Sequence, residues 1–126
     1  MISKDIKNFI LCREFGMCNR AGWFRCGKVR VYLRFGFRYL DKTRRCLCLD
    51  LASVGVNPAC QSKGHFTRFL DELEEFLDKR RPVPSYVECV VEARLWGFFK
   101  RRGYKRVKCE DVCFLREPHL KGAKPA

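Results

Sequence analysis

Residues 56–77 read VNPACQSKGHFTRFLDELEEFL, and this stretch decides the fold. It begins at the end of an apolar run, passes Pro58 and a short loop that contains Gly64, and continues with the apolar spacing of an amphipathic helix. A helix that starts directly after such a loop presents unpaired amide groups, aligned with the positive end of its dipole. The junction therefore predicts a pocket for an anion, with a plain turn as the alternative.

The loop before this helix supplies several groups that suit an anion. Gly64 lets the backbone approach a ligand closely, and His65 offers its main-chain amide. Lys63 and Arg68 add positive charge on either side of that glycine. The predicted binding loop consists of Gln61, Ser62, Lys63, Gly64, His65 and Phe66, with Arg68 following in the helix.

Two strands are expected before the loop. Residues 28–40 alternate apolar and mostly basic side chains, which predicts a strand with one buried and one charged face. Residues 46–56 are almost entirely apolar, as expected for a central strand covered on both sides. Gly55 in the second strand marks either a bulge or a close approach of a ligand.

The other segments complete a mixed α+β domain. Helical spacing is expected over 3–15, 65–80 and 92–102, a third strand over 84–91, and a last strand or broken pair of strands over 104–116. Residues 16–27 are predicted to form a loop, and residues 117–126 a loosely ordered tail. One domain over 1–126 follows, with its core at about 28–115 and the element order α, β, β, α, β, α, β.

Composition narrows the class of protein. The 126 residues carry 27 Lys and Arg against 14 Asp and Glu, a formal charge of +13, which predicts attraction to anions. Hydrophobic residues make up 47% of the chain, enough to support a folded core. No apolar run is long enough to span a membrane and no signal peptide is recognised, so we expect a cytoplasmic protein without a membrane partner.

Nine cysteines invite a metal or disulfide interpretation. Their number is odd, several lie in apolar strand-like runs, and no C-x-x-C pair occurs. We therefore expect reduced thiols and no metal site.

Two motifs in order resemble the GNAT superfamily of N-acetyltransferases. The run Q-x-x-G from Gln61 to Gly64 follows a strand and precedes an apolar helix, as in the acyl-CoA signature Q/R-x-x-G-x-G/A of that family. A second family motif, N-x-x-A-x-x-F-Y-x-K-x-G-F, matches at the same spacing the residues Glu92, Leu95, Phe98, Phe99, Arg101, Gly103 and Tyr104. The resemblance covers about residues 28–115, and a weaker similarity connects the chain to small members encoded by tailed bacteriophages.

The resemblance implies a twisted, mostly antiparallel sheet with a splayed central strand pair and helices on both faces. It implies that the loop amides hold the pyrophosphate of acetyl-CoA or another acyl-CoA, with Phe99 and Arg101 beside the cofactor. It also implies that the strand segment Ser53, Val54, Gly55 and Val56 pairs with the pantetheine arm. The implied reaction is direct attack of a primary amine on the thioester, without a cysteine nucleophile.

Three positions depart from the family pattern. Phe66 replaces a small loop residue, so its ring crowds the phosphate site unless it turns into the core. Glu92 replaces the usual Asn, and Phe99 stands where many members have the tyrosine that protonates the leaving thiolate.

Three carboxylates are candidates for the base that deprotonates the amine. Asp50 lies within the apolar strand, where burial raises the pKa of a carboxyl, although a salt bridge to an Arg on the neighbouring strand is the alternative. Glu88 and Glu92 flank the end of the third strand, and each is alternatively a solvated surface acid.

The charged face of the first strand supports a rival function. Lys28, Arg30, Arg34 and Arg38 form a dense basic face with Tyr32 among them, which suits nucleic acid or an acidic protein. Alternatively, the acidic helix over 71–78 covers this face. The primary hypothesis is thus an acyl-CoA-dependent N-acetyltransferase whose acceptor is a protein lysine or an acidic macromolecule. The rival is a non-catalytic basic protein of the same fold, and the oligomeric state is left open.

Overall fold

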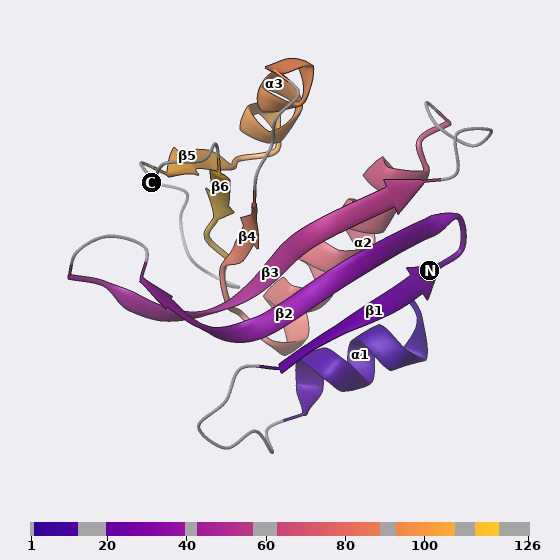
Figure 1. Ribbon diagram of the computed structural model, residues 1–126, viewed down its shortest axis with the longest axis horizontal. Coiled ribbons are helices and arrows are strands. Elements are labelled where there is room, and N and C mark those ends of the chain that lie inside the picture. Colours follow the sequence, from indigo (N-terminus) through magenta and orange to yellow (C-terminus); the bar gives the residue numbers. More distant parts are fainter. Residues whose placement is uncertain are drawn as a thin grey trace.

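The computed structural model describes residues 2–12, 20–39, 43–56, 63–88, 93–107 and 113–118. The described elements follow the chain in this order: α1 (Lys4–Leu11), β1 (Arg20–Cys26), β2 (Val29–Tyr39), β3 (Arg45–Val56), α2 (His65–Arg80), β4 (Ser85–Val87), α3 (Ala93–Arg101), β5 (Lys105–Val107) and β6 (Cys113–Arg116). Within these ranges the strands form one six-stranded sheet in the order β1-β2-β3-β4-β6-β5 (Figure 1). The expected mixed, mostly antiparallel fold is confirmed.

Among the described strands, one neighbouring pair, β3 and β4, is parallel and the others are antiparallel. Strands β1, β2 and β3 pair antiparallel, and so do β4, β6 and β5. Only β3 and β4 pair in parallel, and α2 makes the crossover between them. Neighbouring parallel strands require a crossover connection, which explains why a helix lies between β3 and β4 in the sequence.

Helix α2 forms because its apolar side chains recur on one stripe. Phe69, Leu70, Leu73 and Leu77 are buried, and they belong to the same core as the alternate residues of β2 that face inward: Val29, Val31, Leu33 and Phe35. Burial of each such side chain contributes about 1.5–3 kcal/mol. This packing holds the start of α2 close to the end of β3, where the site is expected.

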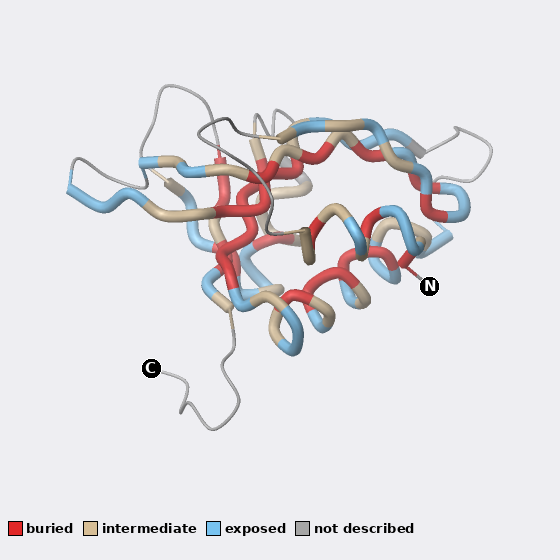
Figure 2. Tube along the Cα trace, turned by 90° about the horizontal axis from the view of Figure 1, so that it is seen from below, coloured by how far each residue is buried: buried red, intermediate tan, exposed pale blue. Residues whose placement is uncertain are grey.

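The described helices leave one face of β1–β3 open. Helices α1 and α2 lie together beneath the sheet, and no described helix covers its other side (Figure 2). Among the described residues, helices therefore cover one face of these three strands. The acidic helix α2 covers the apolar face rather than the basic one, because its apolar stripe must be buried.

The segment that forms strand β1 was predicted to be a loop. This is the main error of the prediction from sequence. Residues of 20–26 pair with β2, and the turn at Gly27 has φ +60°, a conformation that favours glycine. Every second residue of β1, including Phe24 and Cys26, faces the core side. The strand pattern is hidden because Gly22 is one of these inward positions and exposed Trp23 points the other way.

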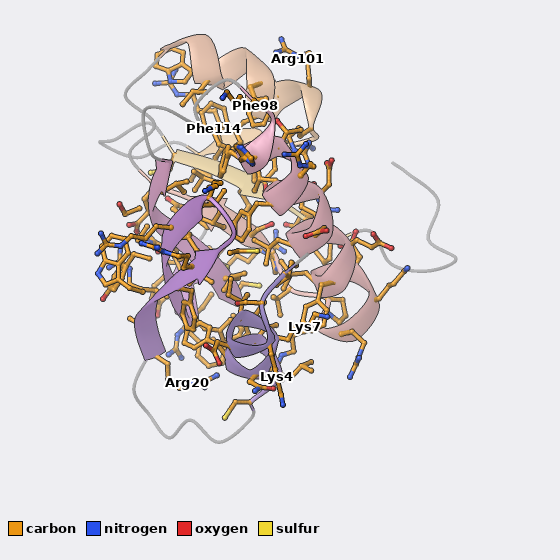
Figure 3. The ribbon with its side chains drawn as sticks, turned by 90° about the vertical axis from the view of Figure 1, so that its right-hand side faces the viewer. Lys4, Lys7, Arg20, Phe98, Arg101 and Phe114 are labelled. Carbon is orange, nitrogen blue, oxygen red and sulfur yellow. The ribbon has the colours of Figure 1, made fainter. Side chains whose placement is uncertain are left out.

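The C-terminal half adds an aromatic core beneath β4, β5 and β6. The ring of buried Phe99 stacks on Phe114 at 5.7 Å and meets the ring of Tyr104 at 5.2 Å. Figure 3 shows Phe98 and Phe114 on the inner side of α3 and Arg101 on its outer side. The broken pair of strands expected over 104–116 is confirmed as β5 and β6, and the expected strand over 84–91 is β4 as far as it is described.

Candidate functional site

Strands β3 and β4 separate after a very short ladder. Their paired residues run from Leu49 opposite Ser85 to Leu51 opposite Val87. The amide of Glu88 then donates a hydrogen bond to the carbonyl oxygen of Leu51 at 3.4 Å. Beyond this point β3 continues to Val56 with β2 alone as its neighbour among the described residues, and Figure 1 shows the two strands diverging.

A bulge bends β3 at the point of divergence. Tyr32 of β2 pairs with Ser53 and Leu33 pairs with Leu51, so Ala52 is an extra residue without a partner opposite. Gly55 pairs in register with Arg30, so its interpretation as a bulge is wrong. Past Ala52, the backbone edge of Ser53, Val54, Gly55 and Val56 that points away from β2 has no described strand partner. It offers amide and carbonyl groups to an extended ligand.

Helix α2 begins at a glycine that leaves its first amides accessible. Gly64 is the N-cap with φ +78°, and it contributes no side-chain hydrogen bond to the helix. A Cβ atom placed there would meet only the guanidinium of Arg68, at 3.9 Å. As the first amides of the helix, those of His65, Phe66 and Thr67 have no acceptor within the helix and lie at the positive end of its dipole.

Cationic side chains surround this helix start. Lys63 and Arg68 are exposed, and the Nη2 atom of Arg68 lies 3.1 Å from Nδ1 of His65. Gln61 and Ser62, the first two residues of the predicted loop, lie outside the described residues.

The ring of Phe66 does not occupy the helix start. It packs inward against Phe98 with centroids 6.1 Å apart, and against Phe69 and Phe99 at 6.4 Å. The crowding considered for this position is therefore relieved, because the bulky residue serves the core and only its amide faces the loop.

The positions taken from the second family motif have different surroundings. Phe99 is buried and has no hydroxyl group, whereas Arg101 is exposed on α3. Arg102, which also resembles a phosphate-binding position, instead bonds Asp71 at 2.6 Å and Glu74 at 2.8 Å and ties α3 to α2. Glu92 lies outside the described residues.

Asp50 and Glu88 meet beside the divergence, on the open face of the sheet. Nη2 of Arg38 bonds Oδ2 of Asp50 at 2.8 Å and also pairs with Glu88. Arg34 pairs with Glu88 as well, and its Nε lies 3.6 Å from Oδ2 of Asp50. The guanidinium of Arg38 stacks 4.1 Å above the ring of Tyr86. The expected salt bridge from Asp50 to an Arg on the neighbouring strand is confirmed, and the same arginines bind Glu88.

Burial changes the acidity of Asp50. Desolvation raises the pKa of this carboxyl to about 6, although Arg38 and Arg34 oppose the rise. Its Oδ1 atom is buried without a hydrogen-bond partner in the described structure. The group is thus a buried carboxylate with a free lone pair and a pKa near neutrality, as a general base requires.

The sequence did not assign Arg34 and Arg38 to the site. They were read as part of a uniform basic face, because alternation in β2 does not tell which cations meet carboxylates of β3 and β4. The register of Arg34 opposite Asp50 was the missing information.

The Cys48 thiol is a poor nucleophile. Burial, and the neighbouring Cys46, raise the pKa of Cys48 to about 12, so this thiol is protonated at neutral pH. Among the described cysteines, Cys12, Cys46, Cys48 and Cys113 are free thiols. The described ranges contain no group of three His, Cys, Asp or Glu placed to hold a metal ion.

The order of the strands, the divergence after Leu51 and the glycine-capped crossover helix define a GNAT-like fold. Solved structures agree with this class. The complex named KacTA-DNA is similar, with a TM-score of 0.56 and 12% identity over 91% of this chain and 80% of that chain. A tyrosine-to-phenylalanine variant of the AtaT toxin, bound to the C-terminus of the antitoxin AtaR and acetyl-CoA, has a TM-score of 0.52 and 12% identity.

The same AtaT variant bound to the antitoxin C-terminus without acetyl-CoA has a TM-score of 0.52 and 11% identity. This chain is covered to 71% in both AtaT comparisons and spans 57% and 65% of the length of those two chains. No protein-family model matches the sequence, and no curated protein matches it. In the described ranges, no helix is both long and apolar enough to cross a membrane.

Proposed function

We propose that this protein is an acyl-CoA-dependent N-acetyltransferase that transfers an acetyl group to a primary amine. The observation that carries the proposal is the end of the β3–β4 ladder at Leu51, beyond which β3 continues to Val56 with no described strand on that edge and is followed in the chain by the glycine-capped helix α2. Acetyl-CoA binding by the fold neighbour AtaT supports the same cofactor class here. Acetyl-CoA supplies the activated thioester when bound.

The residues that would hold the cofactor divide into two groups. The amides of His65 and Phe66, with Lys63 and Arg68 near them, would bind the diphosphate, together with Gln61, Ser62 and Gly64 of the loop. The backbone of Ser53, Val54, Gly55 and Val56 would bind the extended arm. Arg101 is proposed as an outer phosphate contact, and Phe99 as part of the apolar floor.

Asp50 is proposed as the base that accepts a proton from the amine. Its Oδ1 atom is free to accept the proton while Oδ2 stays on Arg38. Glu88 would position the entering ammonium, because its carboxylate lies at the end of the same short ladder. Glu92 is proposed for the same region on sequence grounds alone. Phe99 cannot donate a proton, so we expect the thiol group to leave as a thiolate that is protonated by solvent.

Calorimetry with acetyl-CoA tests the cofactor site. Gly64→Glu should weaken binding more than tenfold, because its carboxylate repels the diphosphate and costs more than 1.4 kcal/mol. Gly27→Glu is the matched control, since Gly27 also has positive φ and has nothing within 4 Å of an added Cβ. Equal weakening in both variants would show that strain, rather than repulsion at the site, is responsible. Absence of binding by the unaltered protein would refute the cofactor proposal.

A transfer assay tests the chemistry. Lysate components incubated with labelled acetyl-CoA should gain label, and Asp50→Asn should abolish the gain while acetyl-CoA binding is kept. The rate should rise with pH through about 6, since the base must be deprotonated. A rate that is unchanged in Asp50→Asn would remove Asp50 from its proposed role.

A further inference from the structure

A second surface lies on the open face of the sheet, away from the divergence. Trp23 and Arg25 of β1 stand directly opposite Tyr32 and Arg30 of β2, and Lys28 lies in the turn that joins the strands. We call these five residues the open-face patch. Arg34 and Arg38 continue the same strand face but are held by Asp50 and Glu88, so they do not belong to the patch.

The patch combines an exposed Trp23, stacked on half-buried Tyr32, with cations that have no acidic partner among the described residues. The Trp23 side chain is 52% exposed. Its ring lies 5.1 Å from that of Tyr32, and the guanidinium of Arg30 stacks 4.3 Å above it. Arg25, Lys28 and Arg30 are exposed and form no ion pair with any described residue. Like charges directly opposite each other on a sheet are destabilising, as Arg25 and Arg30 are here, and a bound anion would relieve that repulsion.

We propose that the open-face patch binds single-stranded nucleic acid. Three cations without an acidic partner among the described residues complement backbone phosphates, and the stacked indole, guanidinium and phenol groups provide flat surfaces for bases. A sheet face with exposed rings suits unstacked bases, whereas a duplex groove is read by an inserted helix or ribbon. The acidic residues of α2, such as Asp71 and Glu75, lie under the opposite face (Figure 2), and Asp50 and Glu88 on the open face are paired with Arg38 and Arg34. This inference does not depend on the proposed acetyl transfer.

Fluorescence of Trp23 tests the proposal in the full chain. Trp96→Phe leaves Trp23 as the single tryptophan. Titration with oligo(dT) or oligo(U) of fifteen nucleotides should quench the emission of Trp23. For about three phosphate contacts, affinity should fall with a logarithmic salt slope of roughly −2, or about 15-fold between 50 and 200 mM NaCl. A preference for one oligonucleotide distinguishes DNA from RNA. No binding at 50 mM NaCl overturns the proposal.

Charge-matched variants separate the patch from general attraction. Arg25→Gln with Lys28→Gln should weaken binding about tenfold and flatten the salt slope, while Lys4→Gln with Lys100→Gln, exposed elsewhere, should change it less than about twofold. Trp23→Ala, followed by anisotropy of a labelled oligonucleotide, should lose about tenfold because base stacking is removed. Equal losses in both double variants, or equally tight competition by polyglutamate of the same length, would overturn the proposal in favour of general charge or an acidic protein partner.

Discussion

Two phenylalanines show how a residue can occupy a motif position and serve the core instead. Phe66 and Phe99 were recognised in the sequence as departures from the family pattern. Their rings meet at 6.4 Å beneath the loop, so the aromatic replacement fills space between α2 and α3. Neither the direction of a ring nor its partner follows from spacing along one chain, since both depend on contacts between distant elements.

The raised pKa of Asp50 predicts a pH-dependent stability. The unfolded chain ionises this carboxyl near 3.8 and the folded chain near 6, so between these values the folded state holds the proton more tightly. Proton binding by Asp50 therefore stabilises the folded state. This stabilisation is complete below the unfolded pKa of 3.8 and is lost as the pH rises through the folded pKa of about 6. Raising the pKa from 3.8 to about 6 corresponds to roughly 3 kcal/mol.

Urea unfolding of Asp50→Asn and the unaltered protein at several pH values checks this prediction. The variant cannot titrate at this position, so its stability relative to the unaltered protein should increase by up to about 3 kcal/mol from pH 4 to pH 7. A difference that moves in the opposite direction would mean that Arg38 and Arg34 outweigh desolvation and lower the pKa.

At the scale of elements, the sequence predicted most of the fold because each long element has a regular pattern. Helix α2 and strand β2 have a regular apolar periodicity and β3 is an almost entirely apolar run, and the bounds of all three follow these patterns closely. Strand β1 was missed because Gly22 interrupts its inward face, and the bulge was not located because Ala52 looks like any other strand residue. A bulge is a property of the pairing between two strands, and one strand does not encode it.

The ionic connection between α3 and α2 predicts a measurable loss of stability. Arg102 is 16% exposed and Glu74 is 11% exposed, and Glu74 also accepts a hydrogen bond from Tyr104 at 2.9 Å. Arg102→Gln should therefore destabilise the protein by about 1–3 kcal/mol in urea unfolding, since it leaves Glu74 with fewer partners. Lys79→Gln is the matched control: its pair with Glu75 is exposed and should contribute less than about 0.5 kcal/mol. Similar losses in both variants would contradict the view that Arg102 joins the two helices.

At the scale of the whole molecule, the acidic helix α2 and the open-face patch lie on opposite faces of the sheet. The carboxylates of α2 lie on the side of the sheet that the helices cover, whereas Arg25, Lys28 and Arg30 lie on the uncovered side. The total charge of +13 was plain from composition, but composition does not tell which face a helix covers. That choice followed from burial of the apolar stripe of α2, and it left the basic face accessible.

The three-residue ladder between β3 and β4 also divides this sheet into two blocks that are joined less strongly than the strands within each block. One block contains β1, β2 and β3 with their long antiparallel registers, and the other contains the short strands β4, β6 and β5. Few main-chain bonds join the blocks, so the seam should open at a lower free energy than the interior of β2. In native-state hydrogen exchange, the amide of Leu49, which donates to the carbonyl oxygen of Pro84 across the seam, should exchange faster than the amides of Leu33 and Phe35. Uniform protection across both strands would show instead that the sheet opens as one cooperative unit.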